Sequence, residues 1–298
     1  MQALELVVDA KSQLGEGPVW HPEEQALYWV DINENRLHRY DPATGRDESR
    51  RFERMIGAAV PCADGGFVLA MQDGIYRLAS FGGAEPERVA VPEGLHDGLR
   101  FNDGKCDPRG RFWAGTLSLV GTPNDGKLYC IGTDYRAETK VEEVTCSNGL
   151  AWSPDGDTMY YIDTPTRVVI AYAYDIETGR IGDGREAVRV APEDGVPDGM
   201  AIDEEGMLWV AHWGGGQVIR YDPRSGKALE RIAVPASHCT SCAFGGPNRD
   251  ELYITSARVG RTPEQLEAEP LAGGLFRIRV GAKGMPTDFF GSGASICR

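Results

Sequence analysis

The chain has 298 residues, of which 41% are hydrophobic and 26% charged, and its formal net charge at pH 7 is −14. This composition is ordinary for a globular protein, and the acidic charge argues against nucleic acid or an anionic membrane as a partner. No apolar run approaches the roughly 18 residues of a membrane span, and the first residues lack the features of a signal peptide. Seven cysteines without regular spacing do not form a disulfide framework. We therefore expect a cytoplasmic protein that binds neither nucleic acid nor membrane.

A short predicted strand, Leu4–Val8, precedes a unit that repeats along the chain. In the clearest units a polar, oxygen-bearing residue opens an apolar run, the run ends in a tight turn, and a second apolar run follows. Gly57 and Ser241 occupy the same register in the two remaining units. The six openings are 41 to 50 residues apart, which is the length of a β-propeller blade. The other four openings are Glu16, Asn102, Asn148 and Asp198.

Three copies of one hairpin turn mark the outer part of the repeat, at residues 41–45, 175–179 and 222–226. Each copy begins with aspartate and ends with glycine, which supply the side-chain cap and the positive φ that such a turn needs. The strands between the turns are short and rich in Val, Ile, Tyr, Phe and Trp. The sequence thus predicts an all-β, six-bladed β-propeller that forms one domain over residues 1–298.

The N-terminal strand has no place in the first blade, because it precedes the first opening. We expect Leu4–Val8 to supply the outermost strand of the last blade, beside residues 275–280. This pairing would close the ring and remove an open sheet edge. The best helical candidate, Pro263–Ala268, falls in a loop between strands of the last unit.

The first strand of each propeller blade lines the central channel, so the residues that open these strands lie on one rim around the axis. Glu16, Asn102, Asn148 and Asp198 would then converge. Two carboxylates and two amides suit a hard divalent cation such as calcium, magnesium or manganese, and open oxygen sites also accept zinc or ferrous iron. Alternatively, these Asn-Gly and Asp-Gly pairs are simple turns. The shared register favours the metal site.

The second strand of each blade returns to the same rim, which brings Asp31, Asp163 and His212 near the openings. Asp31 and Asp163 are placed to hydrogen-bond the groups that bind the metal, unless each only caps the next turn. His212 would line the pocket, although a single histidine at a strand end is more often structural. Arg100, two residues before Asn102, suits carboxylate or hydroxyl oxygens of a ligand, unless it is an ordinary surface charge.

Four motifs follow one another along the chain: Leu14–Trp20, Arg100–Lys105, Ser147–Ser153 and Pro197–Met200. Together they resemble the regucalcin (senescence marker protein), gluconolactonase and luciferin-regenerating family, and the resemblance covers nearly the whole chain. It implies a six-bladed propeller of sugar-lactone hydrolases with one divalent metal ion on the axis. It also implies that Glu16, Asn148 and Asp198 bind the metal and that Asp198 is the general base. Arg100 and Asn102 are implied as substrate contacts.

Two further stretches, His212–Gly215 and Pro270–Gly274, look like those of bacterial sugar-acid lactonases of pentose and hexose catabolism. One segment departs from the family pattern. After Thr116, regucalcin-like members carry acidic residues that reach the sugar, whereas this chain has Leu117–Val120. This loop therefore lacks the acidic contact to the sugar that the resemblance implies.

From the resemblance we expect a metal-dependent sugar lactonase that hydrolyses a pentono- or hexono-lactone to the sugar acid. One divalent ion (calcium, zinc, manganese, magnesium or ferrous iron) would polarise the carbonyl while Asp198 takes a proton from water. Two alternatives remain. The first is a calcium-dependent aryl esterase or phosphotriesterase of the paraoxonase type, and the second is a non-enzymatic calcium-binding protein. The sequence carries no signal for the oligomeric state.

Overall fold

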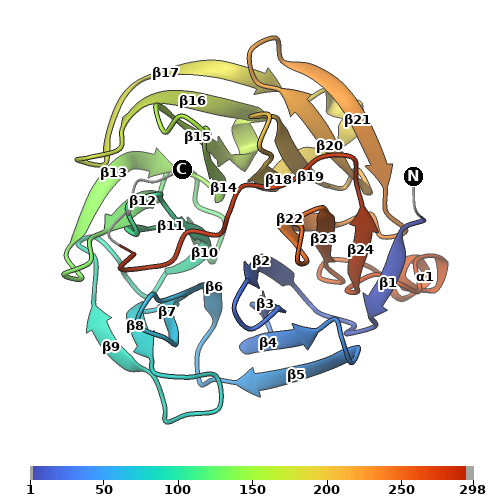
Figure 1. The fold of residues 1–298 in the computed structure, drawn as a ribbon, viewed down its shortest axis with the longest axis horizontal. Coiled ribbons are helices and arrows are strands. Elements are labelled where there is room, and N and C mark those ends of the chain that lie inside the picture. Colours follow the sequence, from blue (N-terminus) through green and yellow to red (C-terminus); the bar gives the residue numbers. More distant parts are fainter. Residues whose placement is uncertain (1–2, 293–298) are drawn as a thin grey trace.

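Six four-stranded antiparallel sheets stand in a ring around a central channel in the computed structural model, which describes residues 3–292 (Figure 1). This is the six-bladed β-propeller predicted from the repeat. All six openings of the repeat lie in the strands nearest the axis. These innermost strands are β2 (Gly15–His21), β6 (Ile56–Pro61), β10 (Leu99–Cys106), β14 (Ser147–Trp152), β18 (Val196–Ile202) and β22 (Cys239–Gly245).

Each blade continues outward with three more strands, which are antiparallel to their neighbours. The second strands are β3 (Ala26–Asp31), β7 (Phe67–Met71), β11 (Phe112–Ser118), β15 (Thr158–Asp163), β19 (Leu208–Trp213) and β23 (Glu251–Ser256). The third strands are β4 (Arg36–Asp41), β8 (Gly74–Leu78), β12 (Gly126–Ile131), β16 (Val168–Asp175), β20 (Gln217–Asp222) and β24 (Leu275–Arg279). The outermost strands are β5 (Arg46–Arg51), β9 (Glu87–Ala90), β13 (Ala137–Val144), β17 (Arg180–Arg189), β21 (Lys227–Ala233) and β1 (Glu5–Val8).

Burial decreases from the channel outward. Every residue of β3, β6 and β14 is buried, because neighbouring blades cover both faces of these strands. In the outermost strand β5 no residue is fully buried. This gradient explains why the inner strands are continuous apolar runs in the sequence, whereas the outer strands carry most of their charge.

The three predicted hairpin turns join the third and fourth strands of the first, fourth and fifth blades, and they share one geometry. In each turn the glycine N–H donates to the aspartate carbonyl at 2.8 Å, and the glycine φ is between 66° and 71°. The aspartate carboxylate accepts from a threonine or serine hydroxyl three residues later at 2.7 to 2.9 Å. The repeated Asp and Gly residues thus have the capping and positive-φ roles that the sequence predicts.

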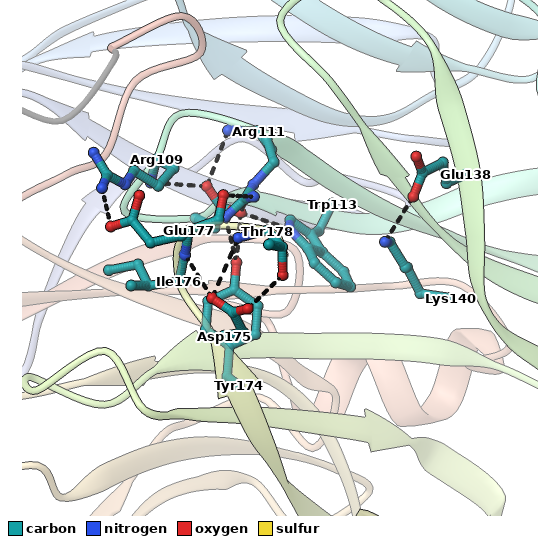
Figure 2. Close-up of polar contacts among 11 residues, drawn as sticks. Arg109, Arg111, Trp113, Glu138, Lys140, Tyr174, Asp175, Ile176, Glu177 and Thr178 are labelled. Carbon is teal, nitrogen blue, oxygen red and sulfur yellow. Dashed lines mark hydrogen bonds and ion pairs between the residues drawn. The ribbon is translucent and has the colours of Figure 1, made fainter. Parts of the chain in front are cut away.

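A buried carboxylate, that of Asp107, links two neighbouring blades near the turn at residues 175–179, and Figure 2 labels its partners Arg111, Trp113 and Tyr174. Asp107, which follows β10 and has no exposed surface, accepts from Trp113 Nε1 at 2.9 Å and from the Tyr174 hydroxyl of the next blade at 2.6 Å. Arg111 Nε donates to the same carboxylate at 2.6 Å. In the fifth blade Asp203 accepts from a tryptophan and an arginine in the same way. The Asp107 network helps to fix the relative position of two adjacent blades, whereas the Asp203 network joins strands of one blade.

The N-terminal strand completes the last blade, as the sequence predicts. Strand β1 pairs with β24 so that Glu5 lies opposite Arg277, and Arg277 Nη2 donates to Glu5 Oε2 at 2.9 Å. The helix α1 (Pro263–Ala268) lies between β23 and β24 and begins with a capping box. Two short 3-10 helices, η1 (Thr164–Thr166) and η2 (Pro192–Asp194), follow β15 and β17. Within residues 3–292, no helix has the length and apolarity that crossing a bilayer requires.

The chain after β24 crosses the ring at the end of the channel where the innermost strands finish (Figure 1). The Met285 N–H donates to the carbonyl of Ile202 at the end of β18, and the Phe290 N–H donates to that of Pro61 at the end of β6. Residues 285–288 line the channel here. This C-terminal segment covers part of the channel end that lies opposite the openings.

Candidate active site

Each innermost strand has a register shift at or next to its opening residue. In β10, β14 and β18 the shift is a bulge in which two residues, 102–103, 148–149 and 198–199, face one residue of the next strand. A β-bulge interrupts the alternation of side chains and changes the direction in which one of them points. The opening side chains owe their direction to these bulges.

The second ring of polar residues pairs with the backbone directly before the openings. Ser147 lies opposite Asp163, and Pro197 lies opposite His212. Gly15 lies opposite Asp31 in the same register. The predicted ends of the second strands therefore lie beside the openings at one end of the channel.

The glycines that follow Asn148 and Asp198 lie within strands and not in turns. Neither Gly149 nor Gly199 is among the glycines with positive φ. A Cβ atom on Gly149 would lie 2.9 Å from the Asp198 carbonyl oxygen, and one on Gly199 would lie 2.0 Å from Ser241 Oγ. Glycine is needed here because neighbouring innermost strands approach each other closely. The alternative interpretation of these two pairs as turns is therefore wrong.

A chain of hydrogen bonds joins the third, fourth and fifth blades at the openings. Arg100 Nη1 donates to Asn102 Oδ1 at 2.7 Å, and Asn102 Nδ2 donates to Asn148 Oδ1 at 3.2 Å. Asn148 Nδ2 donates to Thr164 Oγ1 at 2.8 Å, and this hydroxyl donates to the Pro197 carbonyl at 2.9 Å. These hydrogen bonds set the orientation of the Asn102 and Asn148 amide groups, and the last of them reaches Pro197, the residue before Asp198.

Glu16 and Asp198 bring two carboxylates into this buried network. Only 2% of Glu16 and 5% of Asp198 is exposed. Burial and the nearby charge of Asp103 raise the pKa of Glu16 to about 8. Burial, together with Glu16 and Asp103, raises the pKa of Asp198 well above its ordinary value, while Arg100 and a hydrogen bond from Asn148 oppose this shift. Two buried carboxylates this close are stable as anions only when a cation compensates their charge.

These donors fit a divalent cation. Glu16 and Asp198 supply carboxylate oxygens and Asn148 supplies an amide oxygen, which are the ligand types of calcium, magnesium and manganese. Among the residues that the structure describes, no three His, Cys, Asp or Glu side chains form a group that could hold a metal ion. A third protein ligand to an ion bound between the two carboxylates would therefore be of another kind, and the Asn148 amide, which hydrogen-bonds Asp198, is a candidate.

Asp31 and Asp163 hold the chain just before two of the openings. The Asp31 carboxylate accepts from the backbone N–H groups of residues 13–14 at 2.9 and 3.1 Å. The Asp163 carboxylate accepts from those of residues 145–146 at 3.2 and 2.8 Å. Asp31 also accepts from the N–H of Glu34 in the following turn at 3.2 Å. Both aspartates thus support the openings through the backbone, and Asp31 caps a turn as well.

His212 has no exposed surface. Its Nδ1 donates to the Asp194 carbonyl at 2.9 Å, and the Tyr221 hydroxyl lies 3.3 Å from Nε2 as the donor to that atom. Burial lowers the pKa of His212 to about 4, so the ring is neutral at physiological pH. Contact between His212 and a substrate stays a prediction, and it would require one of these hydrogen bonds to break.

His212 makes the free energy of unfolding depend on pH. The pKa of about 4 in the folded protein lies below the ordinary 6.5, so the unfolded chain binds more protons between these values. The stabilisation is present above pH 6.5 and is lost as the pH falls towards 4. His212→Asn keeps a donor for the Asp194 carbonyl but does not titrate.

Between pH 7 and pH 4 we expect the wild type to lose about 3 kcal/mol more unfolding free energy than His212→Asn. Urea unfolding of both proteins at each pH measures this difference. The contributions of all other titrating groups to the unfolding free energy are common to the two proteins and cancel in the difference. Parallel pH profiles would contradict the prediction.

Comparison with known protein families identifies the family to which the chain belongs. A family model described as "SMP-30/Gluconolactonase/LRE-like region" matches residues 14–258, which include all six innermost strands. The chain belongs to the SMP-30/gluconolactonase/LRE-like family. The resemblance drawn from the four sequence motifs is thereby confirmed.

Members of the SMP-30/gluconolactonase/LRE-like family match nearly the full chain. Regucalcin of Danio rerio is 41% identical over 287 residues, covering 95% of this chain and 96% of that protein. The 6-deoxy-6-sulfogluconolactonase of Pseudomonas putida is 40% identical over 291 residues, covering 97% of this chain and 99% of that protein. The crystal structure of a calcium-binding regucalcin from Agrobacterium tumefaciens has a TM-score of 0.92 at 29% identity and covers 97% of each chain.

In this member of the SMP-30/gluconolactonase/LRE-like family, the end of β11 and the two residues after it carry aliphatic side chains, Leu117, Leu119 and Val120. Leu117 pairs with Arg100 and forms a bridge with Cys146, so the segment rises beside the openings. Leu119 is 39% exposed and Val120 is 84% exposed. The rim near Arg100 therefore presents aliphatic side chains where the sequence resemblance implies acidic ones.

Three residues at the openings or in the channel below them were not predicted from the sequence. Thr164 orients the Asn148 amide through its hydroxyl, and no sequence pattern marks it. Asp103 is the second bulge residue of β10, where the fourth and fifth blades have glycine. Lys105 lies further along the same strand. Asp103 and Lys105 could have been noticed in the sequence because they are charged residues within an innermost strand, where most residues are buried.

Proposed function

We propose that this protein is a metal-dependent hydrolase of sugar lactones that releases the corresponding sugar acid. The observation that carries the proposal is the buried group of Glu16, Asn148 and Asp198 at one end of the channel. The family supports it, since a relative of nearly the same length, 40% identical, is a 6-deoxy-6-sulfogluconolactonase. Which sugar lactone this protein prefers depends on the loops around the rim.

In the proposed reaction Asp198 accepts a proton from the attacking water. The hydrogen bond from Asn148 holds the Asp198 carboxylate in place for this transfer. Arg100 and Asn102, which are fixed to each other at 2.7 Å, orient the hydroxyl groups of the substrate and hold its carbonyl near attack geometry. A divalent cation bound by Glu16, Asn148 and Asp198 would supply Lewis-acid polarisation of the lactone carbonyl.

The donor set also bears on the cofactor. Oxygen ligands suit calcium, manganese and magnesium and also accept zinc or ferrous iron, so we propose one divalent ion from this group. Calcium has support from the Agrobacterium relative, whose structure is that of a calcium-binding protein.

The six cysteines within residues 3–292 are free thiols, which agrees with the expected cytoplasmic location.

A panel of pentono-, hexono- and aldarolactones, each assayed with calcium, manganese, magnesium, zinc or ferrous iron, tests the proposal. Acid release is followed with a pH indicator. We expect turnover of at least one lactone that a chelator abolishes, with little turnover of aryl esters or phosphotriesters. Preference for aryl esters or phosphotriesters would indicate the paraoxonase-type alternative. Calcium binding without turnover of any substrate would indicate a non-enzymatic role.

A further inference from the structure

Two charged side chains on β10 line the channel beyond the openings and take no part in the proposed reaction. Asp103 and Lys105 lie in the wall of a cavity of about 930 Å³, part of it open to solvent, to which all six innermost strands contribute. Only 5% of Asp103 is exposed. Most of the remaining wall is apolar and includes Trp20, Trp152 and Phe244. Charges in such surroundings act strongly on their neighbours.

Asp103 owes its position to the bulge in β10. It is the second bulge residue, and the equivalent positions in β14 and β18 are Gly149 and Gly199. Its Oδ1 accepts from the Gly104 N–H at 2.6 Å, which holds the carboxylate against the strand. The third blade thus places a carboxylate where the next two blades have no side chain.

The charge of Asp103 reaches both carboxylates of the candidate metal site. Asp103 directly follows Asn102, whose Nδ2 donates to Asn148 Oδ1 at 3.2 Å, and its charge contributes to the raised pKa of both Glu16 and Asp198. Within residues 3–292 no three acidic, histidine or cysteine side chains gather closely enough to share an ion. Asp103 therefore acts on a bound ion through its charge and not as a third acidic ligand.

Lys105 connects the strand of Asp103 to the strand of Asp198. Its Nζ donates to the carbonyl of Met200 at 2.7 Å, and Met200 follows Asp198 by two residues on β18. Asp103 is the charge that acts most strongly on Lys105, and Asp288 of the C-terminal segment also acts on it. The ammonium group is thus fixed between the openings and the far end of the channel.

We propose that Asp103 and Lys105 are positioning residues that set the electrostatic potential at the metal site, with Asp103 strengthening and Lys105 weakening the attraction for a divalent cation. The three carboxylates of Glu16, Asp103 and Asp198 are compensated by two basic side chains, Arg100 and Lys105, and by the divalent ion once it is bound. Removing either member of the pair changes that balance by one unit, in opposite directions. The inference rests on the metal site of the proposed function.

Calorimetric titration of the metal-free, full-length protein with calcium chloride tests this inference. We expect Asp103→Asn to raise the Kd for calcium by at least about tenfold and Lys105→Met to lower it by at least about tenfold, because the Coulomb interaction of a unit charge with a dication several ångströms away exceeds this factor in a partly buried site. The double variant Asp103→Asn/Lys105→Met should return the Kd to within about threefold of the wild-type value. Lys105→Arg keeps the charge and should leave the Kd nearly unchanged.

Removing one member of the pair leaves the other without its compensating charge, so the thermal unfolding midpoint of each variant is measured as well. A purely structural role predicts that both single variants bind calcium more weakly. That result, or an unchanged Kd in both folded single variants, overturns the inference. If Lys105→Met does not fold, the double variant is compared with Asp103→Asn, and its Kd should be lower by at least about tenfold.

These measurements separate the inference from the proposed function, because they do not depend on turnover. Opposite shifts in Kd in a protein that hydrolyses no lactone uphold the inference and refute the hydrolase. If the protein hydrolyses a lactone but its Kd for calcium is unchanged by both substitutions, the hydrolase is upheld and the inference is refuted. A wild-type protein that binds no divalent cation overturns both.

Discussion

Replacing Asp198 with asparagine should lower kcat/KM for the preferred lactone by about 1,000-fold, within the range that general-base catalysis contributes. Asparagine has nearly the same shape and retains an oxygen that can bind a metal ion, but it cannot accept a proton from water. The fall should therefore persist when the metal concentration is raised to saturation. Steady-state kinetics at saturating metal, together with a calorimetric measurement of metal binding, checks this prediction.

Asp222→Asn is the matched control, because it makes the same substitution in the hairpin turn of the same blade. Asp222 Oδ1 accepts from the N–H of Arg224 and Oδ2 accepts from the hydroxyl of Ser225; asparagine keeps the first bond and can donate its amide N–H to the Ser225 oxygen in place of the second. The control variant should keep wild-type kcat/KM. Near-normal lactone hydrolysis by Asp198→Asn with metal bound would remove Asp198 from the role of base.

Replacing Glu16 with glutamine should raise the Kd for the divalent ion by at least about 100-fold, because one of two carboxylates is lost from a buried site where charge attraction amounts to several kcal/mol. Activity should fall at low metal concentration and recover partly at high concentration. This recovery distinguishes a metal ligand from a catalytic base, since Asp198→Asn should not recover.

Calorimetric titration and metal-dependent kinetics of Glu16→Gln measure both effects. Glu23→Gln, at an exposed position in the turn between β2 and β3, supplies the control in the same blade. Equal calcium affinity in Glu16→Gln and Glu23→Gln would show that Glu16 is not a ligand. Asn148→Ala should resemble Glu16→Gln if its amide is the third ligand.

Much of the fold follows from the repeat, because a repeated unit reveals its register in the sequence. The six openings define the innermost strands, and the Asp and Gly residues of three turns define the outer hairpins. Even the pairing of the second ring is predictable, since Asp163 and His212 lie opposite the residues directly before Asn148 and Asp198. These features depend on local chemistry that every blade repeats.

The bulges at the openings could not be predicted, because the same letters describe a turn and a bulge. Residue 149 must be glycine because Met200 and the Asp198 carbonyl of the next blade leave no room for a side chain, and the sequence does not show this contact. Likewise, Thr164 orients Asn148 from a separate part of the blade. Such contacts join distant parts of the chain. The sequence therefore predicts the opening residues but not the groups that orient their side chains.

The last blade combines β1, the first strand of the ring to be synthesised, with β22, β23 and β24, the last three. Strand β1 cannot find β24 until synthesis has passed Arg279, so the five earlier blades must wait as an open arc with exposed edges. Pairing between segments this far apart in sequence is slow, because the entropy of closing the loop opposes it. Once formed, the junction holds both ends of the ring in one sheet, and separation of β1 from β24 gives the propeller a defined place at which to begin unfolding.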